Sequence, residues 1–212
     1  MRERVPAIIK WMYPQRIWDG PAGDKDLYLT FDDGPIPGPT EWVLEQLKTY
    51  NAKATFFCIG ENVEKNPEIF RQVLAEGHVV GNHTYNHLDG WRTPIAEYLE
   101  NTTRAQKVME RELPDGVSLR NPFFRPPYGK IKNVQAKKLQ KLGYRTVMWS
   151  IVSMDYDHRI SAERCYQNVV KNARPGSVIV FHDSHKAEKN LREVLPLVLE
   201  HYTGLGYSFK SL

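Results

Sequence analysis

Five groups of ionisable side chains in this sequence combine residue types that bind metal ions or transfer protons. Each group follows a short, mainly apolar run, near the point where the sequence turns polar. The groups are Asp32 with Asp33, His83 with His87, Arg125, Asp155, and His182 with Asp183. Because the carboxyl ends of parallel strands share one face of a sheet or barrel, we expect these side chains to converge on one site. Turn formation is the alternative explanation, but it accounts for one or two such residues more easily than for five groups.

His83 and His87, four residues apart, could share one face of a helical turn and bind a metal ion together. Two imidazoles and one carboxylate leave a coordination position open, which is typical of a catalytic rather than a structural zinc site. The same donors serve non-haem iron oxygenases, whose antiparallel jelly-roll sheets this sequence does not suggest. The adjacent Asp32 and Asp33 repel each other unless a cation neutralises one of them, although these residues taken alone also fit a solvated Asp-Gly-Pro turn.

Arg125 and His182 have side chains that suit such a site. Arg125 opens the sequence Arg-Pro-Pro-Tyr-Gly, whose prolines stiffen the loop, and it could orient a carboxylate. Taken alone, this loop also fits a surface turn. His182 follows a strongly apolar run and suits proton transfer near neutral pH, and Asp155 could hold its ring. Taken alone, His182 also fits a core histidine with satisfied hydrogen bonds. Asp183 is expected to brace the loop after its strand.

Strands and helices alternate along the chain, a pattern typical of parallel βα units. The apolar spacing and the turn residues predict strands over 27–31, 54–59, 78–81, 123–124, 146–152, 176–181 and 207–212. They predict helices over 39–50, 66–77, 94–113, 134–142, 161–173 and 189–202. Roughly six or seven such units fit either a barrel or an open doubly wound sheet, and periodicity alone leaves both possibilities open.

The composition predicts one soluble globular domain. The chain has 212 residues, of which 41% are hydrophobic and 25% charged, and its formal net charge is +4. These values exclude a largely disordered chain and do not require a nucleic-acid partner. No run approaches the roughly 18 apolar residues of a membrane-spanning helix. The first apolar stretch ends at Lys10 and is too short for a signal peptide, so we expect a cytoplasmic protein.

Taken in order, five segments resemble the motifs of the polysaccharide deacetylases, also called carbohydrate esterase family 4 or NodB-homology domains. They are TFDDGP, HTYNH, RPPYG, the region around Asp155, and VFHD. The resemblance implies an α/β fold in a single domain, a distorted (β/α) barrel with about seven parallel strands. It also implies a catalytic domain over 24–212, with residues 1–23 as an N-terminal extension that packs on the barrel.

The family pattern implies roles for the residues of the first three motifs. Asp33, His83 and His87 would be the ligands of a divalent metal ion, with zinc as the first choice and cobalt, nickel or manganese as alternatives. Asp32 would be the general base, and Arg125 would orient it.

The remaining motif residues complete the implied site. Tyr128 would offer its backbone N–H to the oxyanion, and His182, paired with Asp155, would be the general acid. Two positions depart from the family pattern: Tyr156 stands where the family commonly has Trp, and Val152 where it often has Asp. Both departures bear on the substrate groove rather than on the metal centre.

These roles imply a metal-dependent hydrolase that removes N-acetyl groups from a chitin-like or peptidoglycan glycan and releases acetate. Three alternatives stay open: an acetyl-xylan-type ester hydrolase, a non-catalytic glycan-binding domain on the same fold, and a metal-dependent hydrolase of a non-sugar amide. A carbohydrate is the expected partner. Four aromatic side chains near strand ends could stack on sugar rings or pack in the core: Tyr85, Trp91, Tyr128 and Tyr156.

Overall fold

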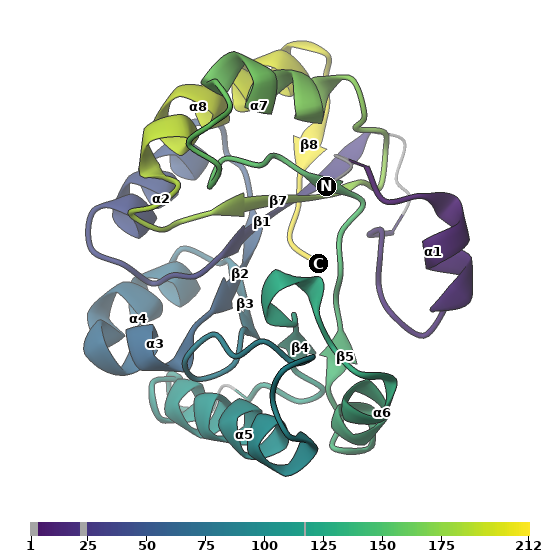
Figure 1. The fold of residues 1–212 in the computed structure, drawn as a ribbon. Coiled ribbons are helices and arrows are strands. Elements are labelled where there is room, and N and C mark those ends of the chain that lie inside the picture. Colours follow the sequence, from purple (N-terminus) through teal and green to yellow (C-terminus); the bar gives the residue numbers. More distant parts are fainter. Residues whose placement is uncertain (1–3, 22–24, 117) are drawn as a thin grey trace.

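The computed structural model describes residues 4–21, 25–116 and 118–212. Its strands form one curled sheet in the order β5-β4-β3-β2-β1-β7-β6, with β8 beside the amino end of β1 (Figure 1). Every pairing between these strands is parallel. The strands are β1 Asp26–Asp32, β2 Ala54–Cys58, β3 Val79–Asn82, β4 Phe123–Phe124, β5 Arg145–Thr146, β6 Ile151–Val152, β7 Val178–His182 and β8 Ser208–Phe209.

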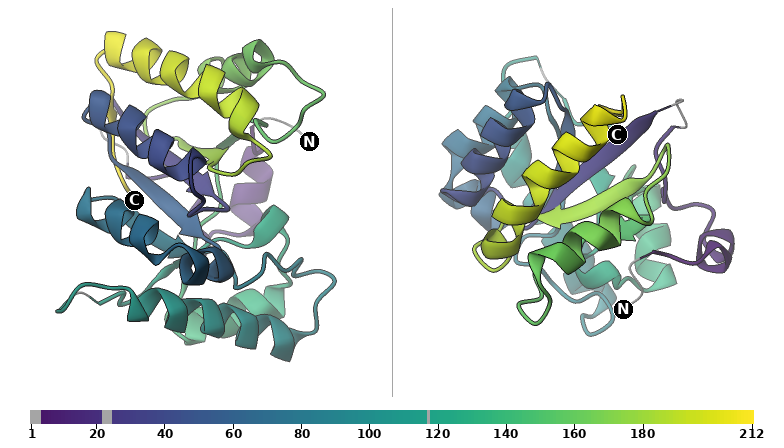
Figure 2. Two further views of the ribbon diagram at one scale, coloured as in Figure 1. Left: turned by 90° about the vertical axis from the view of Figure 1, so that its left-hand side faces the viewer. Right: turned by 90° about the horizontal axis from the view of Figure 1, so that it is seen from above.

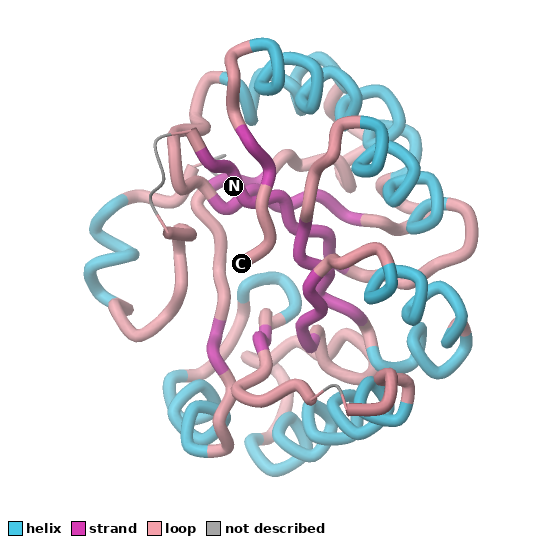
Figure 3. The backbone as a smooth tube through the Cα atoms, turned by 180° about the vertical axis from the view of Figure 1, so that it is seen from behind, coloured by secondary structure: helices cyan, strands magenta, loops and turns pink. Residues whose placement is uncertain are grey.

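Helices surround this sheet, with the strands as the layer inside them, and all of them except the N-terminal helix lie on its outer side (Figures 2 and 3). They are α1 Ala7–Met12, α2 Pro39–Thr49, α3 Gly60–Lys65, α4 Pro67–Ala75, α5 Ile95–Arg111, α6 Asn133–Lys141, α7 Ala162–Val170 and α8 Glu188–Gly204, with a short 3₁₀ turn, η1, over Pro127–Gly129. The arrangement confirms the predicted α/β fold, a distorted (β/α) barrel with about seven parallel strands. Helices α1 and α3 were not expected from the sequence.

One predicted strand is divided in the structure. The run 146–152 contributes β5, which pairs with β4, and β6, which pairs with β7, so its two ends lie at opposite edges of the sheet. The chain between them therefore spans the open side of the barrel. Residues of the N-terminal segment lie along this side through isolated backbone bridges: Ile17 with Val147, Arg4 with Ile151, and Asp19 with Ser177.

The predicted extension over 1–23 includes residues outside the described part of the chain, and the division at residue 24 stays a prediction. Within the described part, Trp18 is buried and its indole N–H donates to the Tyr13 carbonyl at 3.0 Å. Ile8 and Trp11 on α1 are exposed. The segment therefore contacts the barrel through the chain that follows α1 more than through the apolar face of α1.

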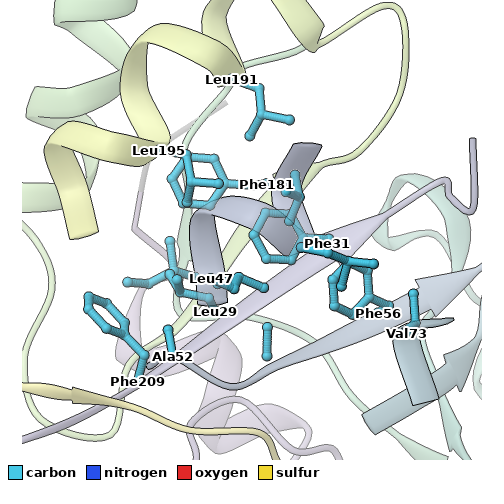
Figure 4. Close-up of a cluster of buried hydrophobic side chains, with 14 of the residues drawn as sticks. Leu29, Phe31, Leu47, Ala52, Phe56, Val73, Phe181, Leu191, Leu195 and Phe209 are labelled. Atoms are coloured by element: carbon cyan, nitrogen blue, oxygen red, sulfur yellow. The ribbon is translucent and has the colours of Figure 1, made fainter. Parts of the chain in front are cut away.

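The main hydrophobic core lies between the sheet and its outer helices. Leu29 and Phe31 of the central strand β1 are fully buried, and Phe31 stacks against Phe56 and Phe181 of the two neighbouring strands at centroid distances of 5.1 and 6.0 Å (Figure 4). Because side chains alternate along a strand, this packing directs Thr30 and Asp32 to the interior of the barrel.

No helix in the described ranges combines the length and the apolar character that a membrane span requires.

Candidate metal centre and active site

The structure brings the candidate residues together at the carboxyl ends of the strands. Asp32 and His182 are the last residues of the adjacent strands β1 and β7 and lie opposite each other in register. His83 directly follows β3 and Arg125 directly follows β4. Asp155 lies three residues after β6. The strands thus position residues that are distant in sequence around one cleft.

Asp33, His83 and His87 form a cluster suited to a metal ion. Asp33 Oδ1 lies 3.8 Å from His83 Nε2 and 3.3 Å from His87 Nε2, and the three ligand atoms are within 4.8 Å of one another. Within the described part of the chain, Asp33 Oδ1 is buried and accepts no hydrogen bond. A buried carboxylate oxygen without a donor is costly, and a cation between the three atoms would satisfy it. The residues present therefore fit a metal ion.

The two histidines do not lie on a helical turn, so that expectation is wrong. Residues 83–87 form a loop in which Thr84 and His87 have φ of 65° and 60°. The Asn82 side chain accepts a hydrogen bond from the Thr84 N–H at 2.9 Å, and Thr84 Oγ1 accepts one from the Leu88 N–H at 3.1 Å. These side-chain bonds hold the left-handed backbone that directs both imidazoles towards Asp33.

The hydrogen bond of His83 selects its tautomer. His83 Nδ1 lies 2.8 Å from the Arg125 carbonyl oxygen, which can only accept, so Nδ1 carries the proton and Nε2 presents its lone pair to the cluster. Burial and, after it, the neighbouring His87 lower the pKa of His83 to about 3, against the opposing pull of Asp33. Burial also lowers the pKa of His87. Both rings are therefore neutral at pH 7, as metal ligation requires.

Arg125 is fully buried behind Asp32 and holds it in place. Its Nη1 donates to Asp32 Oδ1 and to Thr30 Oγ1, both at 2.7 Å, and its Nη2 donates to the Met148 carbonyl at 2.8 Å. The guanidinium also lies over the Phe57 ring, 4.0 Å from its centroid. One Asp32 oxygen is thus occupied by Arg125, and the carboxylate as a whole is fixed at the wall of the cleft.

Asp155 holds His182 through two hydrogen bonds. His182 Nδ1 donates to Asp155 Oδ1 at 2.8 Å, and the His182 backbone N–H donates to Asp155 Oδ2 at 2.8 Å. Burial lowers the pKa of His182, but the charge of Asp155 and its hydrogen bond prevail, with help from Asp33 and Asp32, and raise the pKa to about 9. His182 is therefore protonated at neutral pH, with Nε2 free of the Asp155 bond.

Asp183 braces the loop that carries Asp33. Its Oδ1 accepts from the Gly34 N–H at 3.0 Å, and its Oδ2 accepts from the Thr40 hydroxyl at 2.7 Å. A Cβ at Gly34 would lie 2.0 Å from Asp183 Oδ2, so only glycine fits this contact. Burial raises the pKa of Asp183 to about 8, against the hydrogen bonds from Thr40 and Gly34.

The cleft between these groups has a volume of about 340 Å³. Asp32, Asp33, His83, His87 and His182 line it, whereas Arg125 and Asp155 lie behind the residues that they hold. The other lining residues are Pro126, Tyr128, Gly129, Lys130, Trp149, Val152, Tyr156, Val180 and Lys186.

Sequence reasoning missed several of these lining residues. Lys130, Trp149 and Lys186 were not singled out; Trp149 lies inside a run that reads as a buried strand, and the two lysines lie in loops just outside the motif segments. Tyr156 packs edge-on against His182, with ring centroids 4.9 Å apart. Tyr85 is buried, and its hydroxyl donates to Glu64 at 2.6 Å, so it is not available to stack on a sugar.

Sequence comparison finds relatives of this chain among known proteins. The model of the polysaccharide deacetylase family matches residues 19–147. A peptidoglycan-N-acetylglucosamine deacetylase of Bacillus cereus is 36% identical over 202 residues, covering 92% of this chain and 90% of the relative. A chitooligosaccharide deacetylase of Azorhizobium caulinodans is 39% identical over 158 residues, covering 74% of this chain and 73% of the relative.

The solved structures include a similar chain. A crystal structure of a peptidoglycan N-acetylglucosamine deacetylase in complex with 4-naphthalen-1-yl-N-oxidanyl-benzamide superimposes with a TM-score of 0.87 at 33% identity. The match covers 98% of this chain and 95% of that one.

Proposed function

This chain belongs to the polysaccharide deacetylase family, and on that premise we propose that it hydrolyses N-acetyl groups of an acetylated glycan in a metal-dependent reaction. The observation that carries the proposal is the grouping of three candidate ligands, a carboxylate held by an arginine, and a histidine held by an aspartate around one cleft. Relatives that deacetylate peptidoglycan and chitooligosaccharides support a chitin-like or peptidoglycan substrate.

Asp33, His83 and His87 would hold the metal ion in the proposed enzyme. Two imidazole nitrogens and one carboxylate oxygen, with a position left open, suit a catalytic zinc ion, and cobalt, nickel or manganese are the alternatives. When bound, such a cation supplies Lewis-acid activation of water and of the acetyl carbonyl.

The chain's own residues perform the proton transfers. Asp32 accepts a proton from the attacking water, and Arg125 keeps its carboxylate oriented. His182 donates the proton on Nε2 to the departing sugar amine, and Asp155 stabilises the charged ring before that step. The backbone N–H of Tyr128, at the edge of the cleft, donates to the developing oxyanion. The products are acetate and a free amino sugar.

The proposal predicts chelator-sensitive acetate release from purified protein. We expect acetate release from chitotetraose and from peptidoglycan glycan. The chelator dipicolinate should lower the rate by at least about 10²-fold, and added zinc should restore it. Acetyl-xylan and a small acyl amide serve as comparison substrates. Acetate release from the small amide but from no glycan would contradict the proposal. So would an undiminished rate in protein from which the chelator has removed the metal.

The pKa of His182 sets the alkaline limit of the reaction. His182 must be protonated to act as the acid, so kcat/KM should fall as the pH rises through its pKa of about 9. In Asp155→Asn the charge that most raises this pKa is gone, while burial still lowers it, so the alkaline limb should move down by roughly 1–3 pH units. A pH profile of acetate release measures this shift.

Asp157→Asn is the matched control for this profile. Asp157 is a carboxylate in the same loop, but it pairs with Arg159 at 2.7 Å rather than with His182. Its replacement should leave the alkaline limb in place. An unchanged limb in Asp155→Asn, or an equal shift in both variants, would remove His182 from the role of acid.

A further inference from the structure

A second cleft, of about 560 Å³, adjoins the catalytic cleft. Tyr128, Gly129 and Trp149 line both of them, so the two form a continuous surface. The opposite wall of the second cleft comes from the N-terminal segment, including Ile9 of α1 and Trp18. In Figure 1, α1 stands apart from the sheet, beyond the chain that links β5 to β6. We call this second cleft the N-terminal groove.

Aromatic side chains form much of the N-terminal groove. Trp91 and Tyr128 also reach solvent, with exposed fractions of 61% and 55%, whereas Tyr13, Trp18 and Trp149 are less exposed. Exposed aromatic surface that continues into a catalytic cleft is typical of a ligand groove. Flat apolar ring faces of this kind suit the C–H faces of a sugar.

The charged residues of the N-terminal groove are all positive. Arg4 and Arg16 line it, and none of the carboxylates in the described part of the chain does. Arg16 has an exposed fraction of 8%, and its Nε is buried without a hydrogen-bond partner in the described part of the chain. Its Nη2 donates to the Asn133 side-chain oxygen at 3.3 Å, and its guanidinium lies 4.2 Å from the centroid of the Tyr13 ring.

Among the residues that the structure describes, Arg16 therefore has no carboxylate counter-ion. No ion pair joins Arg4 or Arg16 to a carboxylate within the described residues. A buried guanidinium is costly without an anion, and arginine binds carboxylates through paired hydrogen bonds. A ligand that brings a carboxylate into the groove would satisfy it.

We propose that the N-terminal groove is a subsite for a neighbouring sugar of the glycan that carries a carboxylate, with Arg16 and Arg4 as the anion partners and Trp91 and Tyr128 as the stacking surface. The proposal rests on the proposed function, because the catalytic cleft would hold the acetylated sugar next to it. A neutral sugar would use the aromatic surface but would bring neither arginine a carboxylate partner. The carboxylate can be the lactyl group of a muramic residue or can belong to a peptide attached to that group.

The test compares matched substrates by kcat/KM for acetate release. The substrates are chitotetraose and a tetrasaccharide of alternating N-acetylglucosamine and N-acetylmuramic acid in three forms: free lactyl carboxylates, lactyl amides, and lactyl groups extended by L-alanyl-D-glutamate. We expect wild-type protein to prefer at least one carboxylate form over the amide by about tenfold or more. Which form is preferred distinguishes the sugar's own carboxylate from that of the peptide.

Variants assign this preference to the groove. Arg16→Gln and Arg4→Gln should each lower kcat/KM for the preferred carboxylate form by about tenfold and leave chitotetraose and the amide within about twofold. Arg92→Gln is the matched control, because Arg92 is a neighbouring exposed arginine that pairs with Asp89 and does not line the groove.

Each outcome of these measurements decides between the hypotheses. If Arg16→Gln does not fold, Arg4→Gln and the wild-type comparison of acid with amide still decide. Equal losses on all substrates would show a structural role, and equal rates on acid and amide in wild-type protein would also overturn the subsite. Normal deacetylation of chitotetraose in those cases would leave the proposed function standing, whereas no acetate from any glycan would remove both.

Discussion

Asp32→Asn is expected to lower kcat for acetate release by about 10²–10⁴-fold while the protein still binds one equivalent of metal. The asparagine keeps the size of the side chain, and its oxygen can still accept the bond from Arg125, but it cannot take a proton from water. The metal cluster uses Asp33 rather than Asp32, so its three ligand atoms remain. Elemental analysis and acetate release on the same preparation measure both expectations.

Asp26→Asn is the matched control for this variant. Asp26 begins the strand that Asp32 ends, and it pairs with Lys210 at 3.4 Å, away from the cleft. Its replacement should leave kcat unchanged within about twofold.

The Asp32→Asn variant removes the negative partner of the buried Arg125, so its melting temperature should also be lower than that of the wild-type protein. Turnover that survives in folded, metal-loaded Asp32→Asn would exclude this residue as the base.

The positions of the strands and of the polar residues after them could be predicted from the sequence. The run Leu27–Phe31 is mostly apolar because the strand is buried on both faces, and the chain becomes charged at Asp32, where the strand meets the cleft. The same reasoning places His182 at the end of β7. These are local signals, and the parallel sheet converts them into one shared site.

The parts that the sequence did not reveal depend on contacts between distant segments. The run 146–152 is apolar, as a strand would be, but nothing local indicates that β5 pairs with β4 and β6 with β7 at the other edge. The loop that carries His83 and His87 depends on left-handed backbone at Thr84 and on hydrogen bonds from Asn82. A spacing of four residues fits a helical turn equally well, so spacing alone cannot separate the two.

Arg125 shows how one residue couples the two halves of the site. Its guanidinium holds Asp32, while its backbone carbonyl accepts the Nδ1 proton of His83. The sequence suggested the first contact through residue type, but it contains no signal for the second, because any residue has a carbonyl. The orientation of the proposed base and the tautomer of a proposed ligand therefore depend on the same short segment after β4.

His83→Ala is expected to abolish metal binding and to lower acetate release by at least about 10²-fold, since the metal supplies the charge stabilisation of the reaction. His83 is nearly fully buried and contributes one of three ligand atoms, and two remaining donors hold a divalent ion weakly. His78→Ala is the matched control. His78 is a buried histidine just before β3, and its Nδ1 accepts the Ala54 N–H at 3.3 Å, away from the cleft.

Both variants remove a buried imidazole next to the same strand, so both should lower the melting temperature by a few degrees. Only His83→Ala should lose the metal ion in elemental analysis, and added zinc should not restore its acetate release. Equal metal content in the two variants, or wild-type turnover in His83→Ala, would show that the cation is bound elsewhere. In that case the buried, unpaired Asp33 oxygen would need a different explanation.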